Sequence, residues 1–373
     1  MERKLLHWDV IQEILLRLPV KSLIRFKCVC KSWHSLISDP HFAKSHYELS
    51  AAPSLKFLRI ACSGFEALSI DVYAPLNVGR LIPPLLPPNP DKDVYICGFC
   101  RGFVLIERYP NFCIWNPSTG SHRELSCPEI WKEEHQFVTI RLAGFGYDPS
   151  TDDYLVAVLF DSAFDDEIYT VKRLMLFSLR TNIWKEIQGS HLPDLSVYQY
   201  QSFFFNDVVH WLACRDEPFH CVILAFDLEK KNFYEISLPH LDVNHSFSYS
   251  ELGTMGECLC FCCHFGDDTK TQVWIMKEYK VQSSWTMLEI PTHLSVVCMA
   301  KGGELIALRF DDTELLKFND KGQLLERCMF DFRCWNWVLE FGFGMYTDSL
   351  LSLPRDCDGN TPSTEIDQEN RNV

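Results

Sequence analysis

The sequence begins to define a fold at Asp9-Val-Ile-Gln-Glu-Ile-Leu-Leu-Arg-Leu-Pro-Val-Lys-Ser-Leu-Ile-Arg-Phe-Lys-Cys-Val-Cys-Lys-Ser-Trp33. Asp9, with Gln12 three residues later, has the spacing of a capping box, in which two side chains satisfy amides at the start of a helix. Apolar residues then recur at helical spacing up to Leu18. Pro19 cannot continue a helix, so the sequence predicts a first amphipathic helix that ends there.

Three more short helices are expected before residue 48. A second amphipathic stretch follows from Ser22, and a third runs through Trp33. Asp39 followed by Pro40 predicts the cap and the first residue of a fourth helix. A module this small buries too little apolar surface to be comfortably stable alone. We therefore expect it to dock on a partner or, as the alternative, to pack as a cap on its own domain.

This stretch resembles the F-box, the module by which substrate receptors attach to the Skp-type adaptor of Skp-cullin-F-box ubiquitin ligases. The matching residues, with plant-type motifs at 18–23 and 31–33, are Asp9, Glu13, Ile14, Leu15, 17–23, 25–29, 31–33 and 36–40. Where the family has a proline ahead of this stretch, the chain has His7. The resemblance implies that the module binds the adaptor and through it a cullin scaffold. The residues expected to contact the adaptor, or to hold the helices in place, are Leu6, Ile14, Leu15, Leu18, Pro19, Leu23, Phe26 and Trp33.

Charge is distributed unevenly along the chain. The 373 residues carry a net charge of −15, of which residues 1–50 contribute +3 and residues 51–373 contribute −18. Nucleic acid binding depends on Lys and Arg that neutralise phosphates, so we expect none here. The contrast between a basic module and an acidic remainder favours two different partners, and the acidic part favours a basic target protein.

Composition also bears on the compartment. No apolar run approaches the 18 or so residues that a membrane span needs. The N-terminus leads into an amphipathic helix rather than a secretory signal, so we expect a soluble protein of the cytoplasm, the nucleus or both. The 17 cysteines are odd in number and lie in a long chain, which predicts reduced thiols rather than a disulfide framework.

From residue 55 onward, short β-like runs replace the helical period. The stretch Pro83-Pro-Leu-Leu-Pro-Pro-Asn-Pro90 predicts a surface loop, with a polyproline ligand for an SH3-like groove as the alternative. A strand, a polar turn and a second strand then recur five times, at intervals of 42 to 64 residues, with further strand-like runs between them. Intervals of this size match propeller blades of four strands each.

The sequence thus predicts an α+β multi-domain fold, in which a small N-terminal helical F-box precedes a large all-β, β-propeller-like domain. A two-sheet β-sandwich is the alternative, because the first interval is uneven. The expected boundaries are 1–48 for the F-box helical module, 49–94 for a linker and first β strands with the proline-rich loop, 95–353 for the β domain and 354–373 for a disordered tail.

Residues 95–353 resemble the F-box-associated domain of plant F-box proteins, often labelled F-box/kelch-like. The residues that carry the resemblance include Gly98, Gly102, Trp115-Asn-Pro-Ser-Thr-Gly120, Gly144-Phe-Gly-Tyr-Asp148, Phe177-Ser-Leu-Arg-Thr-Asn182, His210-Trp-Leu212, Leu224-Ala-Phe-Asp227, Tyr346 and Ser349. The resemblance implies a protein-interaction domain. Both pollen S-locus F-box proteins and immune-receptor-regulating members fit these scaffold motifs.

The sequence gives little support for a metal site or a catalytic site. Cys258-Leu-Cys-Phe-Cys-Cys-His264 has strand spacing, and a flat strand does not bring four zinc ligands together, so buried thiols are expected. The sequence contains no Gly-x-Ser-x-Gly elbow, phosphate-binding loop or His-Glu-x-x-His pair. We therefore expect no catalytic residue, no cofactor and no metal.

These observations predict a non-catalytic receptor that docks on the Skp-type adaptor and presents a target protein for ubiquitination. The alternatives are an interaction scaffold outside any cullin complex and, with less support, an enzyme with an unrecognised propeller active site. The residues expected to bind the target form an aromatic and acidic group between two predicted strands: Phe164, Asp165, Asp166, Glu167 and Tyr169.

Overall fold

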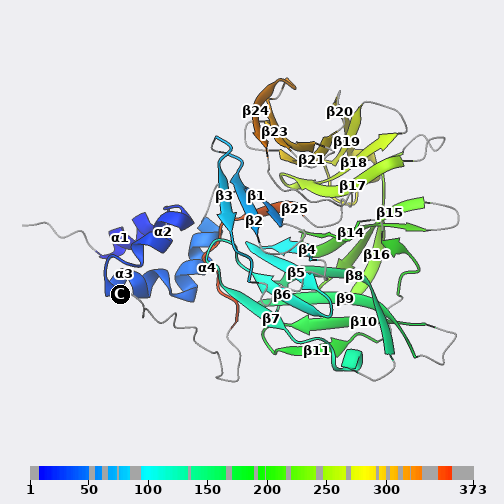
Figure 1. Cartoon of the computed structure of the whole chain (residues 1–373), viewed down its shortest axis with the longest axis horizontal. Coiled ribbons are helices and arrows are strands. Elements are labelled where there is room, and N and C mark those ends of the chain that lie inside the picture. The colour runs from blue at the N-terminus through cyan, green and yellow to red at the C-terminus, as the bar shows by residue number, and fades with distance from the viewer. Residues whose placement is uncertain are drawn as a thin grey trace, which may run out of the picture.

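The computed structural model shows a small helical module beside a ring of β sheets (Figure 1). It describes residues 8–49, 55–60, 66–73, 75–84, 94–132, 136–164, 170–188, 192–197, 199–215, 220–240, 247–265, 270–290, 294–299, 303–309, 314–319, 321–329 and 343–354. None of the helices in these ranges has the length and apolar character needed to cross a membrane.

Four helices form the module, as the sequence predicts. They are α1 (Trp8–Leu15), α2 (Val20–Phe26), α3 (Lys31–Ile37) and α4 (Pro40–Leu49). Asp39 caps α4, because its Oδ1 atom accepts hydrogen bonds from the backbone N–H groups of His41 and Phe42 at 2.9 and 3.0 Å. The predicted capping role of Asp9 is wrong. The helix already includes Trp8, so Asp9 lies within its first turn. A negative charge at this position still interacts favourably with the helix dipole.

The described strands of the β domain divide into six four-stranded blades, of which blades 2 and 4 are joined in one nine-stranded sheet by parallel pairing of β4 with β13. Blade 1 is β1 (Leu55–Ile60), β2 (Ala67–Asp71), β3 (Val78–Leu81) and β25 (Phe343–Thr347). Blade 2 is β4 (Tyr95–Cys100), β5 (Phe103–Arg108), β6 (Asn111–Trp115) and β7 (His122–Leu125). Blade 3 is β8 (Gln136–Asp148), β9 (Asp153–Phe164), β10 (Val171–Ser178) and β11 (Ile183–Glu186).

The remaining three blades continue the same order. Blade 4 is β13 (Ser202–Phe205), β14 (Val208–Arg215), β15 (His220–Asp227) and β16 (Asn232–Ser237), with β12 (Ser196–Val197) paired to β14. Blade 5 is β17 (Phe247–Met255), β18 (Cys258–Phe265), β19 (Thr271–Met276) and β20 (Trp285–Ile290). Blade 6 is β21 (Leu294–Met299), β22 (Leu305–Arg309), β23 (Glu314–Phe318) and β24 (Leu324–Met329). Two 3₁₀ turns, η1 (Glu129–Lys132) and η2 (Gln282–Ser284), complete the elements.

The blades close into a ring, which makes the domain a β-propeller rather than a sandwich. The inner strands β25, β4, β8, β13, β17 and β21 contact one another in that order, and β21 contacts β25 again. Blade 1 is completed by the C-terminal strand, because β25 pairs with β1 from Leu55 opposite Thr347 to Arg59 opposite Phe343. The strands expected between residues 49 and 94 are therefore part of the propeller, which begins at β1, ahead of the boundary expected at residue 95.

The propeller presents two different faces. The proximal face carries the turns at 101–102, 149–152 and 179–182, and α4 lies beside it (Figure 1). The distal face is on the other side, where β9 ends and β10 begins. The antiparallel order of strands within each blade places successive turns alternately on the two faces.

One cluster of buried apolar side chains runs from the helices into the propeller. It contains Leu15 and Leu23 of the helical module, Phe103 and Phe145 of blades 2 and 3, and Leu351 beyond β25. Two domains joined by a flexible linker would have separate cores, whereas this core is shared. The helical module and the propeller are therefore packed as one unit.

Two cysteines correct the expectation of reduced thiols. Cys214 on β14 and Cys221 on β15 are direct cross-strand partners with a Cα–Cα distance of 4.1 Å, and they form a disulfide. The separation of seven residues between these cysteines does not by itself predict a disulfide, because their pairing depends on the register of the two strands. The expected cysteine-rich strand is β18, where Cys260, Cys262 and Cys263 are buried as free thiols.

Candidate functional site

The predicted adaptor-binding residues divide into an exposed and a buried group. Ile14 on α1 is 48% exposed, and Pro19 between α1 and α2 is also exposed. Leu15 and Leu23, by contrast, are only 1% and 0% exposed. An adaptor can touch the first two side chains directly, whereas the two buried leucines hold the helices together.

The other members of the predicted set lie between these extremes. Leu18, Phe26 and Trp33 are half-buried, and the rings of Phe26 and Trp33 pack with centroids 5.4 Å apart. Such side chains brace α2 against α3 while leaving an edge on the surface. Leu6 lies outside the described residues. The adaptor contacts themselves stay predictions.

Exposed apolar residues that sequence reasoning did not assign lie beside Ile14. Val10 is 45% exposed and Trp8 is 42% exposed, both on α1. Val10 and Ile14 are four residues apart, so they lie on the same face of the helix. That spacing was visible in the sequence, but it also fits a core-facing stripe, and only the packing of α1 shows that this face is open.

On the other side of the helical module, Arg101 joins α4 to the propeller. It lies in the β4–β5 turn with a φ of 49°, a backbone conformation uncommon for a residue other than glycine. The guanidinium carbon is 3.9 Å from the ring centroid of Tyr147 at the end of β8, 5.1 Å from that of Tyr47 on α4 and 5.9 Å from that of Tyr154 on β9. Stacking on several rings suits the planar, weakly hydrated guanidinium.

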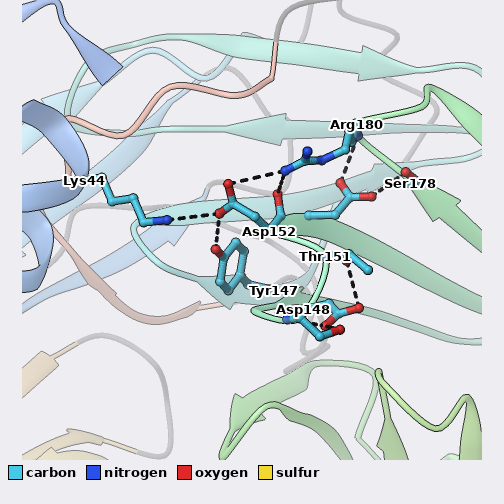
Figure 2. A network of polar contacts seen from close by, with 9 residues as sticks. Lys44, Tyr147, Asp148, Thr151, Asp152, Ser178 and Arg180 are labelled. Carbon is cyan, nitrogen blue, oxygen red and sulfur yellow. Dashed lines mark hydrogen bonds and ion pairs between the residues drawn. The ribbon is translucent and has the colours of Figure 1, made fainter. Parts of the chain in front are cut away.

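A set of polar contacts, which we call the outer layer, is linked to this cation through Tyr147. Figure 2 shows these contacts. Lys44 on α4 reaches Asp152 in the β8–β9 turn, with Nζ 3.3 Å from Oδ1. Arg180 donates to the backbone carbonyl of Asp152 at 2.6 Å and lies 3.3 Å from its Oδ2. The Tyr147 hydroxyl also donates to Asp152, and this bond is the main reason that the pKa of Asp152 is lowered. The Asp152 carboxylate is therefore held ionised between blade 3 and α4.

The two turns that carry this layer are themselves fixed. Asp148 accepts hydrogen bonds from the backbone N–H of Ser150 at 2.9 Å and from the hydroxyl of Thr151 at 2.9 Å. Asp153 accepts a hydrogen bond from the Ser178 hydroxyl and one from the backbone N–H of Arg180 at 2.9 Å. These bonds lock the β8–β9 turn to the β10–β11 turn.

The chain that follows β25 crosses the same place, and we call residues 348–354 the C-terminal strap. It runs past α4 in Figure 1. Asn116, in the turn after β6, donates through Nδ2 to the carbonyl oxygens of Ser349 and Leu351 at 3.1 and 3.2 Å. Arg123 donates to the carbonyl of Pro354 at 3.1 Å. The Trp115-Asn-Pro-Ser-Thr-Gly120 motif thus holds the strap against blade 2.

The predicted target-binding group follows β9 in the sequence, and β9 ends at the distal face. Phe164 is the last residue of β9, and its side chain is not described; Asp165, Asp166, Glu167 and Tyr169 lie outside the described residues. β9 begins next to the joint with α4 and runs away from it. Its end therefore lies on the face that the helices leave open.

Two buried titratable groups in the propeller have shifted pKa values. Burial lowers the pKa of His210 to about 4, and its Nε2 accepts a hydrogen bond from the Tyr279 hydroxyl at 2.7 Å. Burial raises the pKa of Glu107 to about 8, and the Tyr200 hydroxyl donates to its carboxyl group. Shifted values can mark active sites. Here each group bonds to a tyrosine outside its own blade: His210 of blade 4 to Tyr279 of blade 5, and Glu107 of blade 2 to Tyr200, just before blade 4. Among the described residues, no group of three or more His, Cys, Asp or Glu side chains is placed to hold a metal ion.

Comparison with known proteins agrees with this architecture. Residues 5–45 match the F-box domain, and residues 72–307 match the F-box associated beta propeller domain. An F-box/kelch-repeat protein of Arabidopsis thaliana is 30% identical over 305 residues, which cover 76% of this chain and 79% of the relative. The F-box protein CPR1 of the same plant is 26% identical over 341 residues, covering 83% of this chain and 81% of the relative. The chain therefore belongs to the F-box proteins that carry an F-box associated beta propeller domain.

Proposed function

We propose that the chain is the substrate-recognition subunit of a Skp-cullin-F-box ubiquitin ligase, acting in the cytoplasm, the nucleus or both. The observation that carries the proposal is the open apolar face of α1, where Val10 and Ile14 are each nearly half exposed. The helix α1 itself lies at the end of the molecule away from the propeller (Figure 1). Apolar side chains gathered on one helix face mark a docking surface. The adaptor is the partner that the F-box implies.

The β domain is the part that captures the target. Its distal face is free of the helices, and propeller loops commonly carry recognition residues on a rigid scaffold. The acidic character of residues 51–373, with a net charge of −18, supports a target with a basic surface. Catalysis belongs to other subunits, and the receptor contributes by holding target lysines near activated ubiquitin.

The test is co-purification with a Skp-type adaptor. A double variant, Val10→Asp with Ile14→Asp, places two charges on the open face of α1 without touching the core, and it should lose the adaptor. The matched control is Met329→Asp, a change at a 74% exposed apolar residue on β24, which should retain full binding. If the double variant binds as well as the control, or the unmodified chain binds no adaptor, the ligase role fails and a plain interaction scaffold takes its place.

A further inference from the structure

The attachment of the F-box to the propeller has two layers of different strength. The outer layer is the Lys44–Asp152 ion pair, whose side chains are 46% and 58% exposed. Exposed ion pairs contribute little and are screened by salt. The inner layer is the half-buried Arg101, stacked between Tyr47 and Tyr147. Within the polar contacts, and in addition to the buried apolar cluster that the helices share with the propeller, the orientation of α4 therefore depends on the inner layer.

Tyr47 is the helix-side anchor of this inner layer. It lies in the last turn of α4, and its hydroxyl is within hydrogen-bonding reach of the side chains of Arg101 and Thr347. Thr347 is the last residue of β25, the strand that closes the propeller. A single helical side chain thus contacts the first turn of blade 2 and the closing strand of blade 1, two elements that are far apart in the sequence.

The C-terminal strap completes the arrangement. It lies directly on the turn that carries Arg101, because a Cβ added at Gly102 would come 2.3 Å from the Cβ of Ser349. Leu350 and Leu351 belong to the same buried cluster as Leu15 and Leu23 of the F-box. The surface that receives α4 therefore consists of three segments: the β4–β5 turn, the end of β25 and the C-terminal strap. Only the fully folded propeller brings these segments together.

We propose that Arg101 is a positioning residue that fixes the F-box at one angle to the propeller, so that the adaptor end and the distal face move as a single rigid body. The functional consequence of this inference rests on the proposed ligase role. In a ligase, a fixed angle between the F-box and the propeller decides which lysines of the target can reach activated ubiquitin. Replacing Arg101 should loosen the angle while leaving the open face of α1 unchanged.

The direct test measures the distance between the two parts of the full chain. Spin labels are attached through an azide-bearing amino acid at Ser35, exposed on α3, and at Met329, exposed on β24. The unmodified chain should give one narrow distance distribution, and Arg101→Ala should broaden it at least twofold. Arg101→Lys, which keeps the charge but loses the planar stack, should fall between them. Lys44→Ala removes only the exposed ion pair of the outer layer and should leave the width unchanged.

A distribution that stays as narrow in Arg101→Ala as in the unmodified chain would overturn the proposal. If that variant does not fold, Tyr47→Ala replaces it, since this change removes the ring on the helix side and leaves the propeller intact. The same broadening is expected. This measurement needs neither adaptor nor target, so it stands even if the ligase role fails.

A second readout tests the consequence. In a reconstituted ligase, the receptor's own lysines serve as acceptors, and mass spectrometry maps which of them receive ubiquitin. The unmodified chain should show a restricted set, and Arg101→Ala should spread modification to additional lysines at unchanged adaptor affinity. An identical lysine pattern in both proteins contradicts the positioning role, whereas no modification in either contradicts the ligase role instead.

Discussion

Gly102 and Ser349 lie in contact although 247 positions separate them in the chain. An ideal Cβ at Gly102 would stand 2.3 Å from the Cβ of Ser349 and 2.8 Å from the carbonyl oxygen of Thr347. The φ of Gly102 is also +85°, which side chains rarely adopt. Only glycine lets the strap close over the β4–β5 turn, next to the cation that holds α4.

Gly102→Ala should therefore be costly. Left-handed backbone costs a residue with a Cβ about 1–2 kcal/mol and overpacking costs about 1–3 kcal/mol, so we expect a loss of roughly 2–5 kcal/mol in the free energy of unfolding. The matched control is Gly120→Ala, which has a similar φ of +77° but nothing within 4 Å of the added Cβ. Urea unfolding of both variants separates the cost of backbone strain, which both share, from the cost of the steric clash with the strap, which only Gly102→Ala has. Equal losses in the free energy of unfolding would show that the strap is not tightly packed against the β4–β5 turn.

Truncation of two neighbouring residues of α1 should affect different properties: stability at Leu15 and adaptor binding at Ile14. Leu15→Ala empties a buried position and should lower the free energy of unfolding by about 2–5 kcal/mol. Ile14→Ala changes an exposed position and should shift it by less than about 0.5 kcal/mol. If Ile14 is a contact residue, its truncation should weaken adaptor binding about fivefold or more, which corresponds to roughly 1 kcal/mol.

Calorimetric titration with the adaptor, alongside urea unfolding, checks both effects. Ile14→Val serves as the control, because it keeps most of the apolar surface and should bind nearly as well as the unmodified chain. A normal affinity for Ile14→Ala would remove this residue from the contact surface without affecting the fold.

Local sequence signals predict the elements of this protein better than their assembly. Asp39 and Pro40 mark the start of α4 correctly, because capping depends on neighbours along the chain. Asp9 has the same type of signal, yet α1 begins one residue earlier, at Trp8. Such shifts at helix ends are common, because adding one residue to the end of a helix changes the free energy of folding very little.

Long-range relationships leave no comparable local signal. The pairing of β25 with β1 closes the ring, but no turn connects the two strands. The stack around Arg101 combines side chains from α4, β8 and β9, none of which is near it in sequence. The sequence therefore predicts a helical module and a propeller, while the joint between them emerges only from the packed structure.

Stability should depend on pH through Glu107. Burial raises the pKa of this carboxyl group to about 8 in the folded protein, against about 4.3 for an unfolded glutamate. Between these values the folded state holds a proton that the unfolded state has lost. The free energy of unfolding should therefore fall as the pH rises through this window and level off above pH 8.

Glu107→Gln keeps the shape and an acceptor for Tyr200 but cannot ionise. In urea unfolding at pH 5, 6.5 and 8, the free energy of unfolding of the unmodified chain should decline by up to about 1.4 kcal/mol for each step of one in pH, and that of the variant should decline less steeply. Glu124→Gln, at an exposed position on β7, is the control and should leave the slope unchanged. Parallel curves for all three proteins would contradict the role of Glu107.

The last prediction concerns target capture at the distal face. Asp165, Asp166 and Glu167 join β9 to β10, whose adjoining ends lie away from the F-box. If the target is basic, these charges should speed its approach, because surface charge acts mainly on the association rate and its salt dependence. Changing all three to Ser should slow association severalfold at low salt and have little effect at high salt. Phe164 and Tyr169, as aromatic anchors, should instead affect dissociation when changed to Ala.

A control with the same change in charge lies on the proximal side. Glu229, Glu257 and Glu278 are exposed and lie in the β15–β16, β17–β18 and β19–β20 turns. Their triple change to Ser should leave association with the target nearly unaltered, because strand order places these turns on the proximal face, with the F-box. Stopped-flow measurements with the first target recovered from native tissue make the comparison. Equal slowing by both triples would mean that only total charge matters, and slowing by neither would rule out electrostatic capture at the distal face.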